Sequence, residues 1–258
     1  MTTVFDVALQ VAKEVTDVIE GAATGGSTTT LIDTGLLASQ PADFFNNGKL
    51  WIKSGTHADK VFTVTDFTAG GTVTFAAVTG AIVAGVRYAI IRNTYPFDQI
   101  MSAIQRALDS TFTIDSDGTL SGDGTTLVFT LPAGVSNVIR VEMQDSSGRR
   151  NTSNHVRELH NGTLRFDYGF APNDGDVLVV YYKTPHPELV DYTTVIKDEI
   201  NLDWLKHRAA VELLYWGVGM YGGQAEYRIE ERMNKIMLGL KFKAPRRSET
   251  VTIHTAGA

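Results

Sequence analysis

The chain has 258 residues, 43% of them hydrophobic, which is long and apolar enough for one large domain or two to three small ones. Cysteine is absent, which excludes disulfides, thiolate metal sites and a cysteine nucleophile. The formal charge of -6 argues against a general nucleic-acid binder, because phosphate contacts need clustered Lys and Arg.

The N-terminal segment predicts a helix. Val4, Ala8, Val11 and Val15 recur at steps of three and four residues and continue to Ile19, which is one face of an amphipathic helix over about 4–20. The start of the chain lacks the basic residues and apolar run of a signal peptide, so we expect synthesis in the cytoplasm. A Gly- and Thr-rich hinge follows at 25–30, and the helical period ends there.

Residues 28 to 92 predict a β unit. The segments are short, rich in Thr, Val and Ile, and separated by Gly or Asn, which is typical of strands joined by turns. They predict a small sandwich or barrel. The expected strands are Thr29–Asp33, Lys49–Ser54, Lys60–Asp66, Thr72–Ala76 and Arg87–Arg92.

A second helix is predicted from Pro96 to about residue 110, because Phe97, Ile100, Ile104 and Leu108 share one face. A second β region follows over 125–183. Its clearest part is a hairpin in which His155–Leu159 and Leu164–Phe166 flank Asn161-Gly162, the preferred pair for a type I′ turn. The apolar run Val177–Tyr182 predicts a central strand.

The last third is helical in pattern. One helix is expected from about Leu202 until glycines at 217–223 break it, and another from about Gln224 to near Pro245. Packing all four helix faces into one bundle is the simplest way to bury them. The predicted fold class is therefore α+β: a small antiparallel helical bundle carrying two inserted antiparallel β units, with an extended C-terminal tail.

The expected domain organisation follows this order of elements. It comprises a bundle helix at 1–24, the first β insertion at 25–94, a bundle helix at 95–112, the second β insertion at 113–190, paired bundle helices at 191–243, and an extended docking tail at 244–258.

Part of the first β region has a familiar residue pattern. Residues 26–34 (GSTTTLIDT) are followed by residues 43–52 (DFFNNGKLWI), then by Ser54-Gly55, by Asp66-Phe67 and by the glycine-flanked strands up to Tyr88. This string resembles a β module found in neck and other virion proteins of tailed bacteriophages. The helical remainder is similar to phage head-to-tail adaptors.

The resemblance implies a structural subunit of a ring, usually of about twelve copies, that docks beneath the portal and extends the DNA channel. The implied partners are the portal protein, further copies of the chain, and the next neck or tail protein. Viral DNA would pass through the lumen without sequence-specific binding, and no membrane or cofactor is implied. The expected location is the virion neck at the portal vertex, after synthesis in the host cytoplasm.

Two sets of residues are the candidate sites of this reading. The first set, for subunit packing, lies on the predicted C-terminal helices: Trp204, Leu205, Leu213, Trp216, Ile229, Met233 and Ile236. The second set, for portal docking, lies in the tail: Arg246, Arg247, Val251 and Ile253. In the adaptor family this tail often extends to dock onto the portal, and Val251-Thr252-Ile253 could add a strand to a neighbour.

The sequence offers little for catalysis. Gly-x-Ser-x-Gly, His-Glu-x-x-His and P-loop patterns are absent, so we expect no enzyme activity, no cofactor and no metal ligands among the histidines. Asp115, Asp117 and Asp123 alternate with Gly and could wrap Ca²⁺, but Asp and Gly are also ordinary turn residues. The sequence leaves calcium open.

The alternative function is a receptor- or carbohydrate-binding tail or virion protein, with the β units as binding modules. Aromatic residues exposed on a β face would favour it. Arg149-Arg150 and Arg246-Arg247 are either solvated surface or a complement to an acidic portal surface or exiting DNA.

Overall fold

The computed structural model describes residues 2–159, 162–220 and 231–237. The chain divides into two compact units. Within the described residues, unit 1 is formed by those up to Ser110 together with those from Pro187 to residue 237, and unit 2 is formed by Thr111–His186. None of the helices within the described residues has the length and apolar character of a membrane span.

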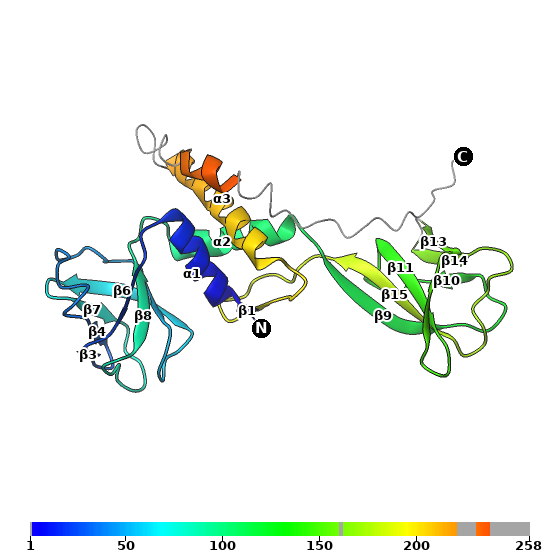
Figure 1. Ribbon diagram of the computed structural model, residues 1–258, viewed down its shortest axis with the longest axis horizontal. Coiled ribbons are helices and arrows are strands. Elements are labelled where there is room, and N and C mark those ends of the chain that lie inside the picture. Colours follow the sequence, from blue (N-terminus) through cyan, green and yellow to red (C-terminus); the bar gives the residue numbers. More distant parts are fainter. Residues whose placement is uncertain (1, 160–161, 221–230, 238–258) are drawn as a thin grey trace. The chain divides into compact units, whose positions relative to one another are not determined.

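Unit 1 contains a curled seven-stranded antiparallel sheet (Figure 1). The strand order is β2-β8-β5-β6-β7-β4-β3. The bounds are β2 (Ile19–Ala22), β3 (Gly25–Gly26), β4 (Thr30–Ile32), β5 (Lys49–Ile52), β6 (Lys60–Thr68), β7 (Thr72–Phe75) and β8 (Arg87–Ile91). All five strands predicted in this region are confirmed, whereas the two short strands before Thr29 were missed.

The helices of unit 1 are α1 (Val4–Val15), α2 (Phe97–Asp109) and α3 (Leu202–Met220), with a further helical segment over 231–237. Thr3 and Asp6 form a capping box at the start of α1. The helix ends before Ile19, because that residue belongs to β2 and pairs with Ile90 of β8. The prediction of a helix up to residue 20 was therefore too long.

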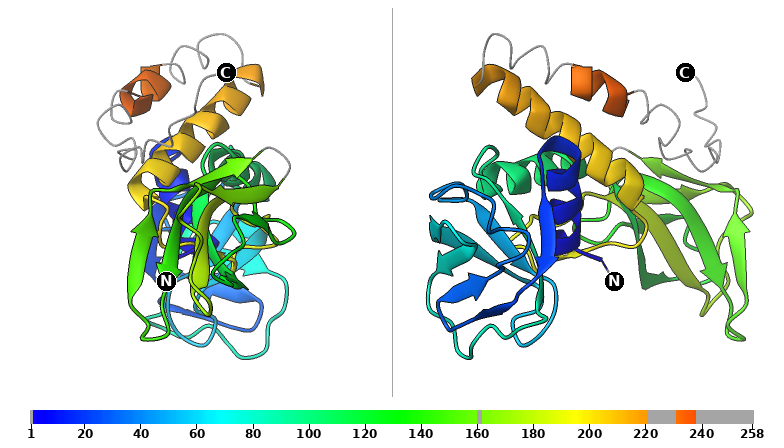
Figure 2. Two further views of the ribbon diagram at one scale, coloured as in Figure 1. Left: turned by 90° about the vertical axis from the view of Figure 1, so that its right-hand side faces the viewer. Right: turned by 60° about the vertical axis from the view of Figure 1, so that its left-hand side comes forward.

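The central helix of unit 1 is α3, which contacts both α1 and α2 (Figure 2). Its buried residues point in most directions around the helix axis, as expected for a helix enclosed by other elements. They are Leu205, Ala209, Ala210, Val211, Leu213 and Leu214.

Of the glycines predicted to break this helix, Gly217 and Gly219 do not, because α3 continues to Met220, whereas Gly222 and Gly223 lie outside the described residues. A Cβ atom at Gly217 would lie 3.0 Å from the Tyr95 ring, so the glycine allows close packing rather than a turn. Tertiary packing here overrides the low helix propensity of glycine.

The predicted fold class is contradicted. The structure is 33% strand and 23% helix, and it is not a small helical bundle with two inserted β units. The helices share one core with the sheet: Trp51 of β5 and Ala89 and Ile91 of β8 lie in the same buried cluster as the residues of α1, α2 and α3. The sheet packs against apolar helix faces that the predicted bundle would bury against other helices. A self-contained helical bundle therefore does not form.

A short strand pair and a buried polar pair also hold unit 1 together. β1 (Thr2–Thr3) pairs antiparallel with β16 (Val195–Ile196), which ties the start of α1 to the segment before α3. In the sheet, the buried Tyr88 hydroxyl donates a hydrogen bond of 2.5 Å to Asp33 Oδ2. Asp33 Oδ1 accepts from the backbone N–H groups of Gly35 and Leu36. The buried carboxylate is thus satisfied on both oxygens.

Unit 2 is built from two antiparallel sheets that enclose a small apolar core. The four-stranded sheet has the order β12-β11-β15-β9, and the three-stranded sheet has the order β10-β14-β13. The bounds are β9 (Thr113–Ser121), β10 (Val128–Thr130), β11 (Val138–Gln144), β12 (Arg150–Ser153), β13 (Val156–Leu159), β14 (Thr163–Phe166) and β15 (Val177–Thr184). The predicted hairpin is confirmed by the β13–β14 pairing, and the predicted central strand by the position of β15.

Candidate functional site

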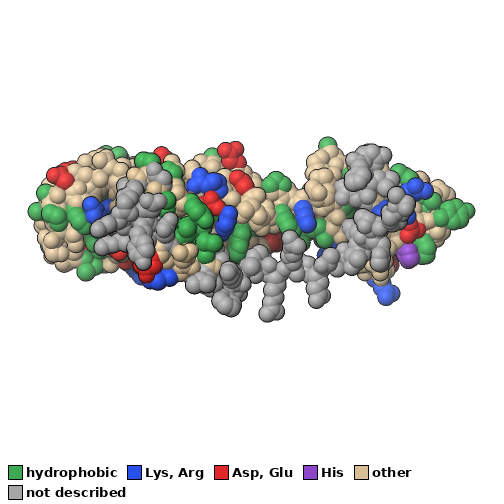
Figure 3. Space-filling model, turned by 90° about the horizontal axis from the view of Figure 1, so that it is seen from above, with side chains coloured by type: hydrophobic (Ala, Val, Ile, Leu, Met, Phe, Trp, Pro, Cys, Tyr) green, Lys and Arg blue, Asp and Glu red, His purple; other side chains and the backbone are tan. Residues whose placement is uncertain are grey.

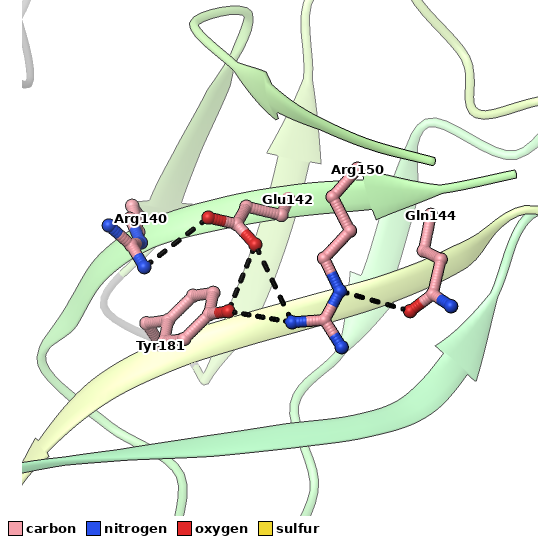
Figure 4. Close-up of polar contacts among 5 residues, drawn as sticks. All are labelled: Arg140, Glu142, Gln144, Arg150 and Tyr181. Carbon is pink, nitrogen blue, oxygen red and sulfur yellow. Dashed lines mark hydrogen bonds and ion pairs between the residues drawn. The ribbon is translucent and has the colours of Figure 1, made fainter. Parts of the chain in front are cut away.

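A polar network lies on one face of the four-stranded sheet of unit 2 (Figure 4). Glu142 is at its centre. The Tyr181 hydroxyl donates a hydrogen bond of 2.9 Å to Glu142 Oε2, and Arg140 Nη2 lies 3.3 Å from Glu142 Oε1. Arg150 donates to the Tyr181 hydroxyl at 3.2 Å and to Gln144 Oε1 at 3.2 Å. The network therefore links three strands through their side chains.

The alternation of side chains along a β-strand places these polar groups on one face of the sheet. Along β11, Arg140, Glu142 and Gln144 alternate with core residues such as Val141, because successive side chains of a strand point to opposite faces. Register then brings Tyr181 opposite Arg140 and Arg150 opposite Gln144. The Arg140 guanidinium lies 4.1 Å from the centroid of the Tyr181 ring, a cation–π contact.

The network carries two guanidinium groups and one carboxylate, so it is locally positive on a chain of net charge -6. Both arginine side chains are about half exposed, whereas Glu142 is largely covered. Elsewhere, side chains of both signs are scattered among hydrophobic ones over the face seen in Figure 3. The network can therefore present guanidinium N–H donors to an acidic group.

A pocket of about 330 Å³ in the same unit is lined by residues of β11 and β12 and of the loop before β15, among them Thr152, which pairs with Glu142 across the strands. Hydroxyl and amide side chains line it, together with Met143 and the rings of His155 and Phe170. Those two rings are stacked, with centroids 3.5 Å apart and planes 11° apart. The pocket therefore combines a flat aromatic wall with neutral polar groups.

The structure places the predicted subunit-packing residues in two settings. Leu205, Leu213 and Ile236 are buried in the core of unit 1, where they contact other parts of the same chain. Trp204, Trp216 and Met233 are partly buried at the edge of that core, and the Trp216 ring lies 6.2 Å from the Tyr95 ring. Ile229 lies outside the described residues, as do the predicted portal-docking residues Arg246, Arg247, Val251 and Ile253.

The carboxylates of the candidate calcium residues Asp117 and Asp123 accept hydrogen bonds from their own sequence neighbours. Asp117 accepts hydrogen bonds from the backbone and hydroxyl of Thr119, and Asp123 accepts from Thr125 and Thr126. These bonds stabilise the carboxylate and lower the pKa of Asp123 below its usual value. Within the described residues, no group of three or more His, Asp or Glu side chains is placed to hold a metal ion.

Three of the described histidines lie in different settings. His57 is buried, with Nε2 at 2.9 Å from the carbonyl oxygen of Gly80, so this nitrogen carries the proton and donates. His207 contacts the backbone of its own helix at Asp203. His155 belongs to the pocket of unit 2.

Sequence reasoning missed the polar network and the aromatic stack. Arg140 and Glu142 were readable as the polar half of an alternating strand, and that pattern was the available signal. Tyr181 lies within an apolar run, so no local pattern indicated that its hydroxyl takes part in a polar network. The His155–Phe170 stack joins residues of different loops, which no local pattern predicts.

Comparisons with known proteins add no family. The chain matches no protein-family model, and the search of curated proteins finds no relative.

Proposed function

We propose that this protein is a structural subunit of a tailed-bacteriophage neck, a head-to-tail adaptor that assembles into a ring under the portal. The ring would extend the DNA channel and link the capsid to the tail. The residue pattern between Gly26 and Tyr88, which resembles a β module of virion proteins, is one support. In the structure this pattern forms most of the seven-stranded sheet of unit 1.

The observation that carries the proposal is a set of large apolar side chains exposed on the C-terminal helices of unit 1. Tyr215 is 52% exposed and Met220 is 61% exposed on α3, and Met237 of the segment 231–237 is 38% exposed. Burying such side chains on association removes apolar area from water and so contributes favourable free energy. We call Tyr215, Met220 and Met237 the α3 surface.

Ring closure requires two different, complementary surfaces on each subunit, because a closed ring forms from head-to-tail interfaces. The α3 surface would be one of them. Leu205 and Leu213 would act indirectly by holding α3 in place, since they are buried within the subunit. Trp204, Trp216 and Met233 are partly exposed and would extend the interface.

The test is native mass spectrometry of the purified chain, alone and mixed with the portal protein encoded in the same phage genome. We expect the chain to join the portal in a copy number that matches the portal ring. Met220→Ser should reduce that occupancy at least about tenfold, which corresponds to about 1.4 kcal/mol, within the range for burying one large apolar side chain.

Val83→Ser is the matched control, because Val83 is 60% exposed and Met220 is 61% exposed. Val83 lies in a loop of the sheet, away from α3 in the chain, and its substitution should leave portal occupancy unchanged. Equal losses in both variants would contradict a role for the α3 surface. A stable trimer that ignores the portal would contradict the adaptor and favour the receptor-binding alternative.

A further inference from the structure

We propose that the pocket of unit 2 binds a neutral saccharide. The proposal is independent of ring assembly, because it concerns a site within unit 2 and not the α3 surface. It rests on the chemistry of the pocket lining, on the stacked rings, and on the way hydrogen bonds hold these groups in place.

The polar part of the lining is neutral. Thr152 and Ser153 supply hydroxyl groups, and Asn154 and Asn173 supply amides, so the wall offers both donors and acceptors. Asp, Glu, Lys and Arg are absent from the residues that line the pocket. The ionisable side chain of the lining, His155, already faces a carboxylate, with its Nδ1 3.8 Å from Asp167 Oδ2. The lining therefore offers an ionic ligand no unpaired charge, whereas the hydroxyl groups of a sugar match its neutral polar groups.

The apolar part of the lining is flat. The His155 and Phe170 rings lie nearly parallel, and Phe170 remains about half exposed. A sugar ring has a face of C–H groups that packs well against such an aromatic surface, and its hydroxyl edges then reach the polar groups. Because each ring restrains the other, little side-chain entropy is lost on binding.

Hydrogen bonds fix the positions of the pocket groups. The side-chain amide of Asn173 donates to Asp176 Oδ2 at 3.0 Å, and its backbone N–H donates to the same oxygen at 3.0 Å. Its amide oxygen is therefore left as the acceptor for a ligand. The backbone N–H of Asp167 donates to the carbonyl oxygen of His155 at 2.8 Å, which ties the loop carrying Phe170 to the connection between β12 and β13 that carries His155.

The size of the pocket suits a small ligand. Its volume of about 330 Å³ lies at the lower end of the range of about 300–1,000 Å³ for ligand sites, enough for one or two sugar rings. On the same loop, Tyr168 is almost fully exposed and adds a further aromatic ring two residues before Phe170. A longer saccharide could extend onto it.

The experiment uses the full chain on a printed array of neutral, sialylated and sulfated oligosaccharides, followed by titration calorimetry with the neutral oligosaccharide that binds best. We expect binding to neutral members of the array. Phe170→Ala should weaken the titrated affinity at least about tenfold, because it removes half of the stacked wall.

Phe112→Ala is the matched control, since Phe112 is also a phenylalanine of unit 2 and both side chains are 48% exposed. Its ring packs under Lys183 and not in the pocket, so its substitution should change the affinity less than about twofold. Circular dichroism of both variants checks that unit 2 stays folded.

Several outcomes would overturn the proposal. They are binding to none of the array, binding only to sialylated or sulfated members, and equal losses in the Phe170 and Phe112 variants. Portal occupancy of Phe170→Ala separates this proposal from the adaptor function, because the variant should still join the portal when saccharide binding is lost.

Discussion

The two units of this protein place a similar polar contact in opposite environments. In unit 1 the hydroxyl of Tyr88 donates to Asp33 inside the sheet, where both residues are buried. In unit 2 the hydroxyl of Tyr181 donates to Glu142 on the outer face of a sheet, beside two half-exposed arginines. The first contact is part of the core, and the second is part of a surface that a partner can reach.

The difference follows from how each unit forms its core. Unit 1 buries a sheet and its helices together, so a polar group inside it must be satisfied within the chain. Unit 2 has only two small sheets, and much of its side-chain chemistry lies at the surface or in the pocket. We therefore expect substitutions in unit 1 to change stability, and substitutions in unit 2 to change binding.

The largest effect is expected for Tyr88→Phe, which removes the hydroxyl and leaves one oxygen of the buried Asp33 without its partner. We expect a loss of about 2–3 kcal/mol in the free energy of unfolding at neutral pH, the usual cost for a buried bond to a charged group. Urea denaturation measures it. Tyr181→Phe is the control, with an expected loss below about 1 kcal/mol because that contact is partly solvated.

The same pair predicts a pH dependence. Burial and the neighbouring Asp33 raise the pKa of Tyr88 above its ordinary value. The unfolded chain therefore loses this proton near pH 10 while the folded chain retains it, so stability falls as the pH rises past about 10. Tyr88→Phe should flatten this alkaline decline, and an unchanged slope would contradict the assignment.

A smaller effect is expected for Gly21→Ala in β2. The added Cβ would lie 2.8 Å from the Tyr88 hydroxyl and 2.9 Å from Asp33 Oδ2. Displacing this pair should cost about 1–3 kcal/mol of unfolding free energy, as overpacking in a core does. Gly25→Ala in β3 is the control, because its Cβ would meet nothing within 4 Å. Thermal denaturation of both variants gives the comparison, and equal stabilities would contradict the steric argument.

The smallest effect is expected for Arg150→Ala in the polar network of unit 2. Arg150 is half exposed and its bonds to Gln144 and Tyr181 compete with water, so the stability loss should stay below about 1 kcal/mol. A loss as large as that of Tyr88→Phe, measured by the same urea titration, would show that the network supports the fold of unit 2.

Local pattern was sufficient for many elements. The strands from Thr30 to Ile91 and the hairpin around Gly162 followed from β-branched segments, glycine punctuation and the Asn-Gly pair. The boundaries failed where tertiary contacts overrode propensity. Ile19 continued a helical period but joined a strand, and Gly217 was one of the glycines expected to break a helix that in fact continues through it.

The sequence by itself determined most of the strands, turns and helices, because these depend on side chains a few residues apart. Only the tertiary structure decided that the helices share their core with the sheet, which overturned the predicted bundle. It also decided the candidate sites. Glu142 meets Tyr181, and His155 meets Phe170, through strand register and loop closure between residues that are distant or unpatterned in the sequence.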